Sequence, residues 1–86
     1  MISTGNLIEK PVYTEKGILV GNVYDVILDF ENGSIYGILI KDTNTGVVNE
    51  GIPISIPFRW IKAIGDAILL LTFPDKVNYN RRNTTQ

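Results

Sequence analysis

The chain has 86 residues, with eight Lys and Arg against nine Asp and Glu, and it contains no cysteine and no histidine. This composition excludes disulfides and thiolate metal sites, together with the commonest zinc ligand and the usual general base of enzymes. The formal charge of −1 provides no long-range field that would hold a phosphate backbone. We therefore expect a single non-catalytic domain without metal or cofactor, and we do not expect nucleic acid as its ligand.

The ends of the chain differ from its middle. The N-terminus, MISTGNLIEKPVY, lacks the basic and apolar regions of a secretory signal, and no apolar run reaches the length of about 20 residues that a membrane span needs. We therefore expect a cytoplasmic protein that does not insert directly into the membrane. We expect one domain over residues 1–74 and a disordered polar tail over 75–86, where Arg81 and Arg82 are solvated rather than bound to nucleic acid.

Short runs rich in Ile, Val, Tyr and Phe, separated by Gly and Pro, predict an all-β fold. Residues 10–14 form a short extended segment, which ends in a turn at residues 15–17. A long strand follows from Val20 to Phe30, with Val20, Tyr24, Val26, Leu28 and Phe30 on one parity. Val23 and Ile27 interrupt the other, polar parity, which indicates a bulge near Asp25.

The stretch FENGSIYGILI predicts a hairpin. Asn32 and Gly33 can adopt the positive φ values of a tight turn, so residues 20–30 and 34–40 should pair in antiparallel fashion. Both parities of residues 35–40 are apolar, as in a strand that is covered on both faces. Within it, Gly37 leaves room for close approach of another backbone.

Residues 41–51 are polar and predict a longer loop, with a β-excursion at Val47 and Val48. Oxygen-bearing side chains in this loop raise the alternative of a hard-cation site, but the spacing of a calcium-binding loop is absent. In residues 52–57 the apolar residues alternate, while Pro53 and Pro57 cannot donate to a β-ladder. We therefore expect a strand that either is an edge or begins at Ile54, and the two prolines would guard such an edge against self-pairing.

The densest apolar stretch, IPFRWIKAIGDAILLLTF, is interpreted as a core hairpin rather than a membrane or partner-binding helix. Gly65 and Asp66 would interrupt a helix after about two turns, whereas they fit the turn between strands at residues 60–64 and 67–73. One helical turn at Pro57-Phe58-Arg59 would join this hairpin to the preceding strand.

Taken in order, KPVYTEKGILVGNVYDVILDFENGSIYGILI and IPFRWIKAIGDAILL resemble the PRC-barrel domain, which occurs in the photosynthetic reaction-centre H subunit and in the ribosome maturation factor RimM. The resemblance runs from about Leu7 to Leu71. It implies a small antiparallel β-barrel, with one short helical turn here. We see neither a transmembrane helix nor a companion domain of the RimM kind, so the resemblance is closest to stand-alone archaeal PRC-barrel proteins of the cell-division (CdpB-like) type.

For such a protein the resemblance implies an adaptor in FtsZ-based cell division. Its partner would be the membrane anchor SepF or another PRC-barrel protein, it would form a homodimer, and it would be recruited to the division site. An RNA- or ribosome-associated assembly factor related to the RimM barrel is the alternative, and a basic stripe on the surface would favour it. A barrel that holds a small ligand or metal would require an interior cavity.

Candidate partner-binding residues follow from the residues alone, since the family offers no catalytic residue to carry over. Aromatic and apolar side chains near an exposed turn often anchor interfaces. Near the proline-flanked edge these are Ile54, Phe58 and Trp60, with Tyr36 as a further candidate. The competing interpretation of Phe58 and Trp60 is that they close the core of a small barrel.

Overall fold

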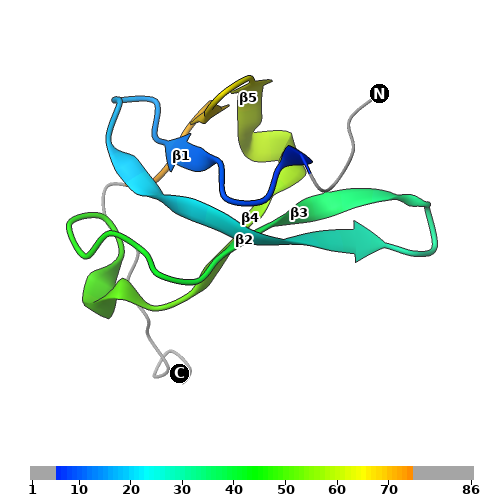
Figure 1. Ribbon diagram of the computed structural model, residues 1–86, viewed down its shortest axis with the longest axis horizontal. Helices are drawn as coiled ribbons and strands as arrows, with labels where there is room; N and C mark the ends of the chain where they lie inside the picture. Colours follow the sequence, from blue (N-terminus) through cyan, green and yellow to red (C-terminus); the bar gives the residue numbers. More distant parts are fainter. Residues whose placement is uncertain (1–5, 75–86) are drawn as a thin grey trace.

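The structure is a computed structural model that describes residues 6–74, so the predicted tail with Arg81 and Arg82 lies outside the described residues. The all-β expectation is confirmed (Figure 1). The helical turn lies one residue later than predicted. The described elements are β1 (Pro11–Tyr13), β2 (Leu19–Asp29), β3 (Ser34–Ile40), the 3-10 turn η2 (Asn49–Gly51), β4 (Ile54–Pro57), the 3-10 turn η3 (Phe58–Trp60), β5 (Ile61–Ile64) and β6 (Ile68–Leu70).

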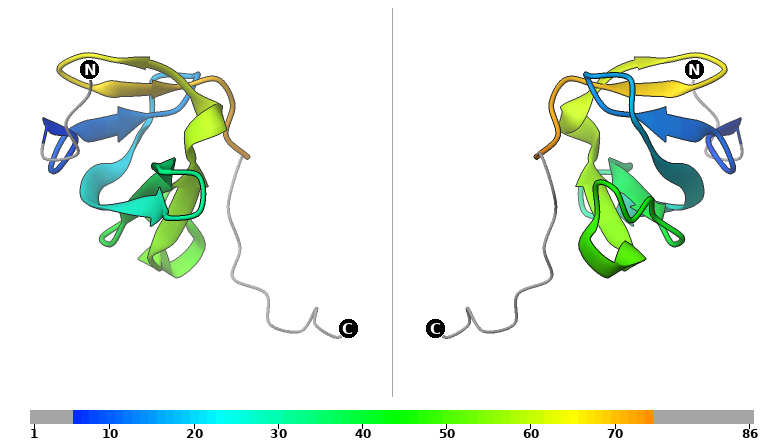
Figure 2. Two further views of the ribbon diagram at one scale, coloured as in Figure 1. Left: turned by 90° about the vertical axis from the view of Figure 1, so that its right-hand side faces the viewer. Right: turned by 90° about the vertical axis from the view of Figure 1, so that its left-hand side faces the viewer.

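The strands form one six-stranded sheet in the order β4-β3-β2-β1-β6-β5. The sheet bends along β2, so that β5 and β6 lie across from β3 and β4 (Figure 2). The expectation of a closed antiparallel barrel is wrong on two counts. The pairing of β1 with β6 is parallel, and β4 and β5 remain two separate edges. Each of these edge strands has four residues, and Pro57 lacks an N–H group, so few donors are available to close the sheet.

The hairpin of β2 and β3 is confirmed, and its register shifts between Val23 and Asp25, where a bulge was expected. Its connection is longer than the predicted tight turn, since it comprises residues 30–33 and only Gly33 has a positive φ, of 64°. The second hairpin, β5 and β6, is also confirmed. Gly65 donates its N–H to the carbonyl oxygen of Ala67 at 2.9 Å, which closes that turn.

The core lies inside the bend of the sheet. From β2 it receives Val20 and Val23, with Val26 half-buried, so every third residue points inward. The predicted parity is wrong because register shifts near Val20 and Tyr24 each add a residue to the strand. The buried apolar residues are Leu7, Val12, Val20, Val23, Ile38, Ile40, Val47, Val48, Ile56, Ile68, Leu70 and Phe73.

Two polar side chains hold the loop between β3 and β4 against this core. Thr43 donates its hydroxyl to the carbonyl oxygen of Ile52 at 2.7 Å, and Asn44 donates its amide to the carbonyl oxygen of Leu19 at 2.7 Å. Val48, in the same loop, forms a β-bridge, as the expected excursion requires. Within residues 6–74, no helix has the length and apolar character that a bilayer crossing requires.

Candidate interaction surfaces

The four predicted partner-binding residues divide between core and surface. Ile54 and Trp60 are half-buried and pack against the core, and Phe58 is half-buried as well. Tyr36 is 53% exposed. Because Pro57 pairs with Gly37 and β3 contacts η3, the backbone at Tyr36 lies next to the turn that carries Phe58 and Trp60. These three residues are named the η3 surface here.

Ile54 lies apart from the η3 surface. It pairs with Ile40 at the other end of β4, three residues from Pro57, which corresponds to about 10 Å along a strand. The backbone carbonyl of Trp60 accepts the N–H of Leu71 at 2.7 Å, which ties η3 to the end of β6. The η3 surface therefore consists of two half-buried aromatic residues on a fixed turn and the exposed Tyr36 on β3, and Ile54 contributes mainly to the core.

A second apolar feature is the hairpin tip, residues 28–34, which projects from the body of the domain (Figure 1). Phe30 is 89% exposed and Leu28 is 46% exposed. The carboxylate of Asp29 accepts the N–H groups of Glu31 and Asn32 at 3.1 and 3.2 Å and the side-chain amide of Asn32 at 2.7 Å. These bonds favour the charged form and lower the pKa of Asp29, the Asn32 side chain having the largest effect. The tip is thus a braced loop that presents an aromatic ring to solvent.

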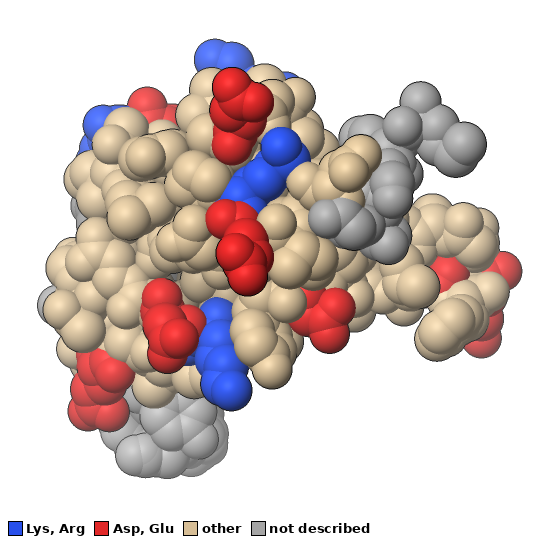
Figure 3. All heavy atoms as spheres, in the orientation of Figure 1, with Lys and Arg blue, Asp and Glu red and all other residues tan. Residues whose placement is uncertain are grey.

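The charged residues around the hairpin tip are all acidic. No Lys or Arg occurs between Lys16 and Lys41, whereas Asp25, Asp29 and Glu31 lie in that interval. In Figure 3 the projecting tip is red and tan, without blue on the visible face. An apolar residue bordered by carboxylates suits a partner surface that is apolar with basic neighbours.

A third feature is the outer face of the sheet opposite the core. Leu19, Tyr13, Leu69 and Ala63 occupy matching positions on four successive strands, so they form one apolar row. Leu69 is 42% exposed between the buried Ile68 and Leu70. Beside the row lies a groove of about 250 Å³, named the outer groove, which is lined by Thr14, Glu15, Gly17, Lys62, Leu69, Leu70 and Leu71.

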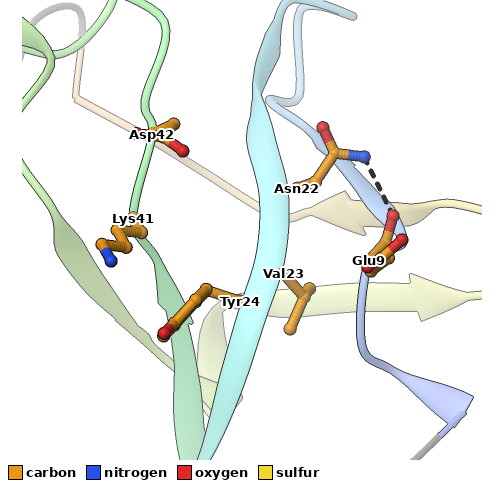
Figure 4. A pocket seen from close by; sticks show the side chains of 6 residues that line it. All are labelled: Glu9, Asn22, Val23, Tyr24, Lys41 and Asp42. Carbon is orange, nitrogen blue, oxygen red and sulfur yellow. Dashed lines mark hydrogen bonds between the residues drawn. The ribbon is translucent and has the colours of Figure 1, made fainter.

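A further hollow of about 250 Å³ lies around the start of β2 and is lined by Glu9, Asn22, Val23, Tyr24, Lys41 and Asp42 (Figure 4). The lining is divided by the strand, with Glu9 and Asn22 on one side and Lys41 and Asp42 on the other. Lys41 Nζ lies 4.9 Å from the centre of the Tyr24 ring, a cation–π contact. Among residues 6–74, no three acidic, His or Cys side chains are grouped as a metal site would require. This hollow therefore offers charged side chains without a convergent set for chemistry.

The sequence interpretation missed Phe30, Leu69 and Leu71. Phe30 was assigned to the apolar parity of a strand, but it follows the last paired residue and has no neighbour to cover it. The usable signal was its place directly before the Glu-Asn-Gly turn, between two carboxylates. For Leu69 and Leu71 no signal exists, because the continuous run ILLLTF does not distinguish an inner from an outer face.

Two comparisons with known proteins bear on the family of this chain. The family model of the PRC-barrel domain matches residues 1–77. An uncharacterized protein of Methanocaldococcus jannaschii is 27% identical over 79 residues, a match that covers 90% of this chain and 84% of the relative.

Proposed function

Because this chain belongs to the PRC-barrel domain family, we propose that it is a non-catalytic adaptor that self-associates and joins other proteins in FtsZ- and SepF-based cell division. The observation that carries the proposal is the exposure of large apolar side chains on fixed elements. They occur at the hairpin tip, on the outer face and, within the η3 surface, at Tyr36. Exposed apolar patches of this kind are typical of protein interaction sites.

The η3 surface and the adjacent β4 edge are the proposed contact for the division partner. Phe58 and Trp60 provide aromatic area on a 3-10 turn that is tied to the end of β6, and Tyr36 extends this area. Rigid aromatic anchors contribute most of the binding energy in many interfaces, since they lose little conformational entropy on binding. The anchor SepF would hold the adaptor at the membrane of the division site.

Charge argues against the RNA-associated alternative. Residues 6–74 contain five Lys and Arg against eight Asp and Glu, a net charge of −3. On the face seen in Figure 3, basic and acidic side chains alternate and no basic stripe is present. A surface of this kind releases few counterions from a phosphate backbone, so it gains little affinity for RNA.

The test is to mix the purified full-length protein with SepF from the same organism in size-exclusion chromatography with light scattering, each protein alone serving as control. We expect co-elution, and we expect the double variant Tyr36→Ala/Phe58→Ala to lose it while keeping its fold by circular dichroism. The matched control is Tyr24→Ala, which removes a similarly exposed aromatic residue on β2. A wild-type protein that elutes separately from SepF at all ratios would remove the division role.

A further inference from the structure

We propose that copies of this chain associate head to tail, with the hairpin tip of one copy inserted into the outer groove of the next. The inference rests on the proposed function, because it assigns the contact through which the adaptor self-associates. The contact requires an exposed tip of defined conformation and a groove large enough for an aromatic ring. It also requires complementary charges, and positions on the domain that keep each tip away from its own groove.

The hairpin tip is exposed and has a defined conformation, as insertion into a groove requires. Phe30 is 89% exposed, so almost its whole side chain is available to a partner. The three hydrogen bonds to the Asp29 carboxylate and the positive φ of Gly33 define the conformation of the loop. A loop that is already ordered loses little entropy on binding, so most of the apolar burial contributes to affinity.

The outer groove fits an aromatic ring. Its volume is about 250 Å³, whereas an apolar cavity of about 150 Å³ is sufficient to hold benzene. Leu69 and Leu71 line it and are 42% and 56% exposed. A phenyl ring in this groove would remove both leucine side chains and itself from water.

The acidic tip can meet one basic side chain in the lining of the groove. The tip carries Asp29 and Glu31 and no basic residue, while Lys62 lines the groove together with one acidic residue, Glu15. Lys16 lies between two lining residues of the groove, Glu15 and Gly17. Attraction between these ends would guide the tip into the groove and set its orientation.

The two features lie at opposite ends of the domain. In Figure 1 the hairpin tip is at the right-hand end, and the turn that contains Gly17, on the groove, is at the left-hand end. One copy therefore cannot fill its own groove, and a pair bound in this way leaves one free tip and one free groove. Such a heterologous contact builds an open chain of copies when the rotation from one copy to the next does not close a ring.

The test follows the mass of the purified full-length protein by sedimentation velocity as its concentration rises. We expect the wild-type mass to pass beyond that of a dimer without a plateau. Phe30→Ser, which removes the tip, and Leu71→Glu, which blocks the groove, should each weaken association about tenfold or more. Tyr24→Ser is the control for loss of an exposed aromatic residue elsewhere, and circular dichroism verifies the fold of each variant.

Mixing the two variants separates this contact from a symmetric one. The Phe30→Ser copy retains a groove and the Leu71→Glu copy retains a tip, so an equimolar mixture should form a dimer that does not grow further. A symmetric contact through the outer face would leave Phe30→Ser unaffected, and a symmetric contact between tips would leave Leu71→Glu unaffected. Either pattern overturns the inference. Occupation of the groove by residues 75–86 overturns it as well, and in that case Phe30→Ser would leave the measured association unchanged.

A charge exchange supplies an independent readout. Glu31→Lys and Lys62→Glu should each weaken association, and the double variant should recover it. Failure of recovery, together with a wild-type dimer of fixed size, overturns the head-to-tail contact while leaving the adaptor function intact. A wild-type protein that stays monomeric at every concentration overturns self-association itself; binding to SepF is then judged separately by co-elution.

Discussion

Two neighbouring residues of the hairpin tip have different roles: one stabilises the loop, and the other is exposed to potential partners. Asp29 belongs to the first group although it lies in the exposed hairpin, because its carboxylate accepts three hydrogen bonds from the loop. Phe30, the next residue, makes no comparable contribution and is 89% exposed. The loop is therefore stabilised by a charge and displays an aromatic ring.

This arrangement predicts a pH dependence of stability. The folded pKa of Asp29 lies below the usual value of 3.8, so its contribution is fully present above that value and is lost as the pH falls through the folded pKa. Asp29→Asn should lower the melting temperature at about pH 7 and have a smaller effect at about pH 2, where more of the wild-type carboxyl is protonated. Asp66→Asn, in the other hairpin turn, is the control. An equal effect of Asp29→Asn at both pH values would contradict the role of the charge.

Trp60 and Tyr36 should behave differently although both belong to the η3 surface. Trp60 packs against the core, so Trp60→Ala should destabilise the fold by about 2 kcal/mol, less than for a fully buried Trp. Tyr36→Ala removes a side chain that is 53% exposed and should change stability by less than about 0.5 kcal/mol. Urea denaturation measures both. Equal destabilisation by the two variants would show that Tyr36 is also structural.

At the scale of elements, the close pairing of β3 with β4 depends on Gly37. A Cβ at this position would collide with the carbonyl oxygen of Ile56 on β4, so close approach of the two backbones requires glycine. Gly37→Ala should cost roughly 1–3 kcal/mol, because one strand must shift away from the other. Gly65→Ala is the matched control, since nothing lies within 4 Å of its added Cβ. Similar unfolding free energies for the two variants would contradict this account.

The sequence predicted local features well and distant pairings poorly. Both hairpins follow from turn residues next to their strands, and Gly37 could be assigned because a lone glycine in an apolar strand indicates close approach. The parallel pairing of Val12 with Ile68 joins residues far apart in the chain, and no local pattern encodes it. Likewise, β4 and β5 become the two edges only in the assembled sheet, although η3 alone separates them in the sequence.

The same distinction holds for the candidate surfaces. Phe58 and Trp60 were identified because aromatic residues beside a proline-flanked turn have a local signature, yet their half-buried state depends on β6 and the core. Two register shifts in β2 move residues between faces, so parity could not place Leu28 or Phe30. The outer row of Leu19, Tyr13, Leu69 and Ala63 exists only after four strands have assembled.

For the whole molecule, the net negative charge predicts weak binding to RNA. The described residues carry a net charge of −3, and the full chain carries −1. Fluorescence anisotropy with a short single-stranded RNA at physiological salt should therefore give a Kd no tighter than about 10⁻⁴ M. Micromolar binding that weakens steeply with added salt would instead favour the RNA-associated alternative.

The domain is proposed to act by presenting the η3 surface to a protein partner. This proposal is tested by titrating the ¹⁵N-labelled full-length protein with unlabelled SepF, followed by two-dimensional NMR under dilute conditions. We expect shifts or line broadening that centre on Tyr36, Phe58 and Trp60, with the interior of β1 unchanged. Amide signals at the η3 surface that stay unperturbed by excess SepF would contradict it.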